Sequence, residues 1–216
     1  MAPREASKAM RRAVSEEDKA SRRQDILSAA KQVFAEKGYH ATTIADIAAA
    51  AGLSYGSIYW YYESKEALFH ELMSAEAASL RQHLAEAVAG ASRAGDPAAP
   101  LAAAVGATIE FYDADRALVK LLFRDAFALG HSFERHLAEI HGSFVDDTER
   151  LVSVLQRQGV LSPGPTRVIA YAVTSLIGQM AHRRLVTDDG LSAESLSRFL
   201  VELVLHGLAR AGAPPA

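Results

Sequence analysis

Between residues 54 and 61 the chain gathers hydroxyl and aromatic side chains in one short stretch. The stretch reads Ser-Tyr-Gly-Ser-Ile-Tyr-Trp-Tyr, and Ile58 is its only aliphatic residue. Hydroxyl groups and the tryptophan N–H are donors that suit phosphate oxygens and the edges of nucleic-acid bases. Gly56 lowers helix stability by about 1 kcal/mol relative to alanine, and close approach to another surface is one use for that cost. The stretch is therefore the strongest candidate binding site.

Two short helices are needed to position this stretch. Thr43 is predicted to cap the first helix, and Asp46 answers three residues later as a shortened capping box. Gly52 then allows a tight turn, and Ser54 caps a second helix that is expected to run to about Tyr61. Two helices joined in this way form a helix-turn-helix, whose second helix can enter the major groove of DNA.

The alternative is a helical hairpin whose aromatic side chains only pack the joint between its helices. We expect that packing role for Ile58 and Tyr62, and it also competes for Trp60 and Tyr61. If the stretch binds DNA, the residues near the start of the second helix reach base edges and those near its end contact phosphates. The first group is Ser54, Tyr55 and Ser57, and the second is Tyr59, Trp60 and Tyr61.

Helical periodicity also marks most of the remaining chain. Apolar residues recur on one helical face from Ile26 to Phe34, and a long helix is expected from Ser64 towards Gly90. No segment alternates with a period of two, so the predicted fold class is all-α with about nine helices. The later helical patterns cover residues 101–112, 116–129, 133–158, 166–184 and 192–209.

Composition and charge limit the functional classes. The 216 residues include no cysteine, which excludes disulfides and thiolate metal sites, and no apolar run is long enough to cross a membrane. A cytoplasmic protein without a membrane partner is expected. The net charge is −3, yet residues 1–24 hold seven cations against four acids, which fits nucleic-acid contact at one end. A solvated charged tail is the alternative.

The segment from Arg22 to Met73 closely resembles the N-terminal domain of TetR-family repressors. The shared motifs are I-x-x-A-A-x-x-x-F-x-x-x-G-Y, T-T-I-A-x-I-A-x-x-A-G-L-S, G-S-I-Y-x-Y-Y and S-K-E-x-L, over about 50 of the 216 residues. Residues 1–20 have little apolar content and no periodicity, so a flexible basic arm is expected there. The resemblance implies a DNA-binding domain over residues 21–73 and an effector-binding and dimerisation domain over 74–212.

The resemblance also implies roles for individual residues. Thr43 clamps a phosphate, Gly56 and its neighbours read bases, and Lys65 meets a phosphate from the start of the fourth helix. Tyr55 stands where relatives often carry lysine or a small residue, so the base preference stays open. The arm of residues 1–20 could add minor-groove or phosphate contacts. The complete expected DNA-binding set is Thr42, Thr43, Ser54, Tyr55, Gly56, Ser57, Tyr59, Trp60, Tyr61 and Lys65.

The larger C-terminal part is expected to supply a second copy and a ligand. A single short helix covers few base pairs, so a homodimer on a palindromic operator is expected. The broad apolar faces of the last two helices predict its interface at Ile169, Val173, Leu176, Ile177, Met180, Phe199, Leu200, Leu203 and Val204. The resemblance implies a pocket for an apolar or amphipathic effector near Ile109, Tyr112, Leu122, Phe123, Phe127, Phe144, Tyr171 and Gln179.

Two rival functions stay open. One is a non-specific architectural DNA-binding protein, although such proteins tend to be strongly basic and this chain is net acidic. The other is a helical metal-dependent enzyme built on His131, His136, Glu139 and His141, although no Glu-x-x-His pair occurs. We predict no enzyme activity, no metal and no cofactor. The predicted function is a ligand-responsive, sequence-specific transcriptional regulator, most simply a repressor.

Overall fold

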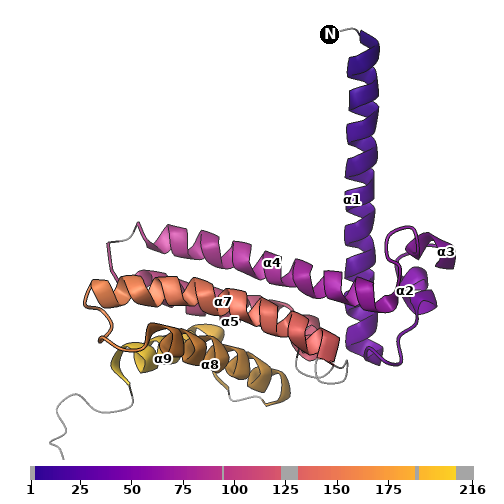
Figure 1. Cartoon of the computed structure of the whole chain (residues 1–216). Coiled ribbons are helices and arrows are strands. Elements are labelled where there is room, and N and C mark those ends of the chain that lie inside the picture. The colour runs from indigo at the N-terminus through magenta and orange to yellow at the C-terminus, as the bar shows by residue number, and fades with distance from the viewer. Residues whose placement is uncertain (1–2, 94, 123–130, 188–189, 208–216) are drawn as a thin grey trace, which may run out of the picture. The chain divides into compact units, whose positions relative to one another are not determined.

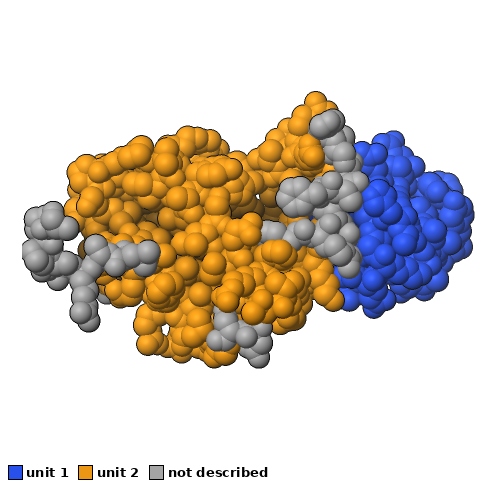
Figure 2. Space-filling model, turned by 90° about the horizontal axis from the view of Figure 1, so that it is seen from below, with its two compact units in different colours: residues 1–73 blue, residues 74–216 orange. Residues whose placement is uncertain are grey.

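The computed structural model describes residues 3–93, 95–122, 131–187 and 190–207. Over these residues helices are the only regular secondary structure, which confirms the predicted all-α class (Figure 1). The chain divides into two compact units, residues 1–73 and 74–216 (Figure 2). No helix in the described part of the chain is both long and apolar enough to cross a membrane.

The first unit is a small helical domain around an aromatic centre. Phe34 is fully buried and meets Phe69 edge to face, with ring centroids 4.9 Å apart. Ile58 and Tyr62 are also buried, which confirms the packing role predicted for both. The unit contains α1 (Pro3–Lys37), α2 (Ile44–Ala50), α3 (Tyr55–Ile58) and the beginning of α4 (Lys65–Ala91).

Helix α1 begins at Pro3, so it takes in most of the residues that were expected to form a flexible arm over 1–20. These residues lack an apolar stripe, but alanine, lysine, arginine and glutamate are good helix formers. Extending an existing helix is also much easier than nucleating a new one. The lack of an apolar stripe is evidence against a packed helical face, but it is not evidence against a helix.

Helix α3 is shorter than expected, because it ends at Ile58 and not near Tyr61. The chain continues in a tighter turn, in which the Trp60 N–H donates to the Ser57 carbonyl at 3.3 Å and the Tyr61 N–H donates to the Ile58 carbonyl at 2.9 Å. Aromatic side chains lose rotamer freedom against the preceding helical turn, so the run of four aromatic residues after Ile58 weakens the helix.

The second unit packs five further helices and most of α4. Its buried core combines Leu101 and Ile109 with Leu155, Ile177 and Leu200 from different helices. The bounds are α5 (Ala99–Ala114), α6 (Arg116–Lys120), α7 (His131–Arg157), α8 (Thr166–Val186) and α9 (Ala193–His206). The helix predicted over residues 116–129 lies partly outside the described residues. Phe123 and Phe127, two of the expected pocket residues, also lie outside them.

Candidate nucleic-acid interface and ligand cavity

A capping box starts α2 as the sequence predicts. The Asp46 N–H donates to the Thr43 hydroxyl at 3.1 Å, and the Asp46 carboxylate accepts from the Thr43 backbone N–H at 2.9 Å. Lys37, in the last turn of α1, donates to the same carboxylate at 2.6 Å. The hydrogen bond from Lys37, followed by those from Thr43, lowers the pKa of Asp46 to about 2. The cap therefore joins α1 to the first helix of the helix-turn-helix.

The cap predicts a specific acid sensitivity. A carboxylate whose pKa is lowered on folding stabilises the fold above its unfolded pKa, and that contribution is lost as the pH falls towards the folded value. For Asp46 the loss falls between about pH 4 and pH 2. We expect Asp46→Asn to flatten the pH dependence of the urea midpoint in this range. Glu63→Gln, at an exposed carboxylate outside the cap, is the charge-matched control, and equal slopes for the two variants would contradict the assignment.

The turn between α2 and α3 uses a left-handed glycine. Gly52 has a φ of +65°, and the Leu53 N–H returns to the Ala48 carbonyl at 2.8 Å. Ser54 then caps α3 by accepting from the Ser57 N–H at 3.2 Å. The predicted helix-turn-helix is therefore present, and its second helix begins at the residue that the sequence indicated.

The outer surface of α3 is open and rich in hydroxyl groups. Tyr55 and Tyr59 are 56% and 45% exposed, and their hydroxyl oxygens lie 3.0 Å apart in a hydrogen bond. That bond raises the pKa of Tyr59. A Cβ atom on Gly56 would have no neighbour within 4 Å, so no described residue covers this side of the helix. Trp60 is 89% exposed, an unusual position for so large an apolar ring.

Two of the expected DNA-binding residues have structural roles instead. Thr42 is buried, and its hydroxyl donates to the Gly38 carbonyl at 2.7 Å, so it cannot meet DNA. The Lys65 ammonium donates to the carbonyls of Tyr39 and Thr42 at 2.7 and 2.8 Å, with the His40 carbonyl at 3.4 Å. Its donors are directed into the loop after α1, and the expected phosphate contact is not available in this arrangement.

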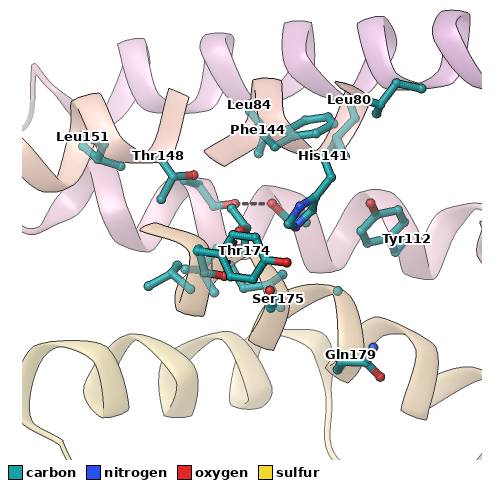
Figure 3. A pocket seen from close by; sticks show the side chains of 18 of the residues that line it. Leu80, Leu84, Tyr112, His141, Phe144, Thr148, Leu151, Thr174, Ser175 and Gln179 are labelled. Carbon is teal, nitrogen blue, oxygen red and sulfur yellow. Dashed lines mark hydrogen bonds between the residues drawn. The ribbon is translucent and has the colours of Figure 1, made fainter. Parts of the chain in front are cut away.

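A cavity of about 390 Å³ lies inside the second unit, between α4, α5, α7 and α8 (Figure 3). Its wall is mainly aliphatic and aromatic, with threonine, serine, tyrosine, histidine and glutamine side chains distributed among them. His141 and Tyr171 meet edge to face on this wall, with ring centroids 5.2 Å apart. The size and the few polar groups are those of a small-molecule site.

The described wall of the cavity carries no formally charged side chain. Burial raises the pKa of Tyr112 to about 12, so its hydroxyl stays protonated, and burial lowers the pKa of His141, which favours the neutral imidazole. A carboxylate or phosphate inside the cavity would lose its hydration without gaining an opposite charge. The wall therefore suits an uncharged, largely apolar molecule that can accept or donate one or two hydrogen bonds.

The cavity contains most of the expected pocket residues that the structure describes. Ile109 is the exception, because it is fully buried in the core and does not line the cavity. Sequence reasoning missed Thr108, Thr148 and Thr174, although polar residues within an apolar helical stripe were a usable signal. The expected residues on the wall are Tyr112, Leu122, Phe144, Tyr171 and Gln179.

The expected dimer residues occupy two different faces of α8 and α9. Val173, Ile177 and Leu200 are buried in the core of their own chain, so their assignment to the interface is wrong. Both helices are apolar on more than one side, and periodicity does not tell the two sides apart. Phe199 is 55% exposed. The remaining expected residues, Ile169, Leu176, Met180, Leu203 and Val204, are partly buried.

The described side chains of the metal-enzyme alternative do not form a metal-binding group. No group of three or more potential ligands that could hold a metal is found within the described ranges. His136 lies 3.1 Å from the Ser74 hydroxyl, whereas His141 faces the cavity.

Comparisons with known proteins agree with the geometry. Residues 26–72 match the model of bacterial regulatory proteins of the tetR family. The chain is 28% identical over 193 residues to the transcriptional repressor KstR2 of Rhodococcus jostii, covering 88% of this chain and 93% of that one. It is 26% identical to the transcriptional activator FasR of Mycolicibacterium smegmatis, over 87% and 83% of the two chains.

A solved structure shares the whole fold. FadR of Bacillus subtilis, in complex with stearoyl-CoA, superposes with a TM-score of 0.76 at 20% identity, covering 86% of this chain and 99% of that one. The helix-turn-helix and the helical second unit define a DNA-binding transcriptional regulator. The N-terminal domain, over residues 26–72, is that of the bacterial regulatory proteins of the tetR family.

Proposed function

We propose that this regulator binds a palindromic operator as a homodimer and releases it when an uncharged acyl group fills the cavity of the second unit. The observation that carries the DNA-binding half is the uncovered face of α3. Tyr55 and Tyr59 are exposed there without a protein partner beyond each other's hydroxyl and ring, and Gly56 lets a neighbouring surface approach closely. Base edges and phosphates supply the acceptors that this face needs.

The homodimer follows from the small size of α3. A helix of four residues reads few base pairs, and a second copy doubles the contacts and imposes a two-fold symmetric site. The outward surfaces of α8 and α9 expose Val168 and Phe199, two large apolar side chains that a second copy would cover. This proposal replaces the buried part of the predicted interface with residues that can reach a partner.

The effector half rests on the chemistry of the cavity. Stearoyl-CoA occupies the FadR structure of the same fold, and its acyl chain and thioester carbonyl are uncharged while its phosphates are not. We assign the acyl part of such a thioester to the cavity, with the Tyr112 hydroxyl donating to its carbonyl. Leu80 and Leu84 of α4 line the cavity, and the same helix begins at Lys65 in the first unit. One helix therefore connects the effector to the DNA-binding residues.

Selection of randomised duplexes with the purified protein tests the DNA half. Enrichment of a palindrome is the expected result. Binding without sequence preference at roughly 150 mM salt would favour the architectural alternative and defeat the proposal. The relatives include both a repressor and an activator. Transcription from a promoter that carries the selected site therefore determines whether this protein represses or activates.

Filling the cavity is expected to uncouple the effector from DNA. Ala104→Trp places a large side chain in the cavity, so the variant should bind the operator normally but no longer release it with long-chain acyl-CoA. Ala102→Trp, on the exposed side of the same helix, is the matched control and should respond like the original protein. Fluorescence anisotropy of labelled operator measures both, with coenzyme A alone as the ligand control. An equal response of the two variants would place the effector elsewhere.

A further inference from the structure

Two threonine hydroxyls on the cavity wall have their hydrogen atoms engaged inside the protein. The Thr108 hydroxyl donates to the Ala104 carbonyl at 2.7 Å, and the Thr174 hydroxyl donates to the Ala170 carbonyl at 3.0 Å. A hydroxyl that donates in this way within its own helix can offer a ligand only its oxygen lone pairs. Both threonines therefore present acceptors, and not donors, to the cavity.

Two other polar groups on the same wall form no hydrogen bond with any described residue. They are the Tyr112 hydroxyl and the ring nitrogens of His141 (Figure 3). Within the described ranges no buried side-chain nitrogen or oxygen is sealed from solvent without a hydrogen-bond partner, so these atoms face space that a ligand can occupy. Burial lowers the pKa of His141, and a neutral imidazole offers one N–H donor and one bare nitrogen as an acceptor.

A saturated acyl group matches only part of this wall. Its thioester carbonyl can accept from Tyr112, but its chain has no O–H or N–H group to donate. Filling the cavity with such a chain would dehydrate the bare nitrogen of His141 and the threonine oxygens without replacing their hydrogen bonds. Dehydrated acceptors without a donor lower the affinity.

The missing group is an uncharged donor. An ammonium group would donate, but no carboxylate on the described wall balances its charge. A ketone would add a second acceptor and no donor. Among the uncharged oxygen functions that an acyl chain can carry, a hydroxyl therefore matches the wall best, because it both donates and accepts.

We propose that the acyl effector carries a hydroxyl group on its chain, and that His141 accepts from this hydroxyl while Tyr112 donates to the acyl carbonyl. The inference rests on the proposed acyl effector and names its chemical class. The remaining hydrocarbon packs against the apolar side chains of the wall, among them Leu80, Leu84 and Phe144. His141 is thus the residue that determines the specificity of the cavity.

Titration calorimetry of the full chain with uncharged esters tests this preference. The probes are methyl dodecanoate and two derivatives, with a hydroxyl on the third carbon or at the end of the chain. At least one hydroxylated ester should bind about 10-fold more tightly than the saturated ester, because a hydrogen bond to an otherwise unpaired buried group is worth about that factor. A saturated ester that binds as tightly as both derivatives would overturn the proposal.

Removing the imidazole nitrogens assigns the preference to one residue. His141→Phe keeps a ring against Tyr171 and should abolish the preference without weakening the saturated ester. Tyr112→Phe should weaken all the esters alike, because all carry the carbonyl. His83→Phe, at an exposed position of α4 outside the cavity wall, is the matched control and should keep the preference. A preference that survives His141→Phe would contradict the assignment.

The esters contain no coenzyme A and are measured without DNA, so this test is separate from that of the proposed function. If a hydroxylated ester is preferred but no acyl-CoA releases the operator, the proposed release fails and the specificity of the cavity stands. If acyl-CoA releases the operator and the esters bind equally, the proposed function stands and this inference fails.

Discussion

Replacing Lys65 by methionine is expected to lower the free energy of unfolding of the first unit by about 2 kcal/mol and to leave the salt slope of DNA binding unchanged. The ammonium donates to two carbonyls of the loop after α1 at 2.7 and 2.8 Å, and it lies 4.4 Å from the centre of the Tyr39 ring. Burial lowers the pKa of Lys65. Methionine keeps the aliphatic length but leaves the carbonyls without their charged donor.

Urea unfolding and salt-dependent binding together separate this role from a phosphate contact. If Lys65 met a phosphate in the complex, its loss would lower the slope by about 1 with little change in stability. Lys120→Met removes the same charge from an exposed position of the second unit and should change neither the stability nor the slope. A Lys65→Met variant that matched this control in stability and lost slope instead would defeat the assignment.

Tyr55→Ala is expected to change which base pairs the protein prefers, with a loss of about 10-fold on the best site. Tyr59→Ala is expected to weaken binding to all sequences by a similar factor, because we propose that Tyr59 contacts the phosphate backbone of the DNA. The two effects should not be independent. Their hydroxyls are bonded at 3.0 Å and their rings pack edge to face at 5.3 Å, so each tyrosine orients the other.

A double-mutant cycle on the selected operator measures this coupling. The combined loss should fall short of the product of the single losses by a factor of about 5. Tyr59→Phe keeps the ring and removes only the hydroxyl, so it divides the coupling between ring packing and hydrogen bond. Normal operator binding by both alanine variants would mean that α3 does not read the DNA.

Local signals predicted the helix-turn-helix well. The capping pattern of Thr43 and Asp46 and the turn at Gly52 are set by residues within a few positions of each other. The same reasoning failed for Lys65, because its partners depend on how α4 returns to the end of α1. It also missed the hydrogen bond from the Thr42 hydroxyl to the Gly38 carbonyl, although the two residues are only four positions apart. Lys65 is 26 positions from Tyr39, whose carbonyl accepts its hydrogen bond, and no spacing pattern in the sequence indicates a contact over that separation.

The second unit was predictable in class but not in detail. Periodicity located its helices, yet Val173 and Ile177 were assigned to a partner when they belong to the core of their own chain. An apolar face indicates burial without saying what covers it. Tyr112 and Gln179 were expected near a pocket and do line the cavity. Ile109 faces the core and not the cavity, and the packing of α5 decides which of these two directions its side chain takes.

The loop over residues 38–43 is held from several sides before any DNA arrives. The Lys65 ammonium donates to the Thr42 carbonyl, and the Thr42 hydroxyl donates to the Gly38 carbonyl. The ion pair between Lys37 and Asp46 holds the start of α2 against the end of α1. The entropy of ordering this segment is therefore lost during folding and not during association. The heat-capacity change on DNA binding should then reflect the surface dehydrated at the contact alone, without the larger contribution that accompanies folding coupled to binding.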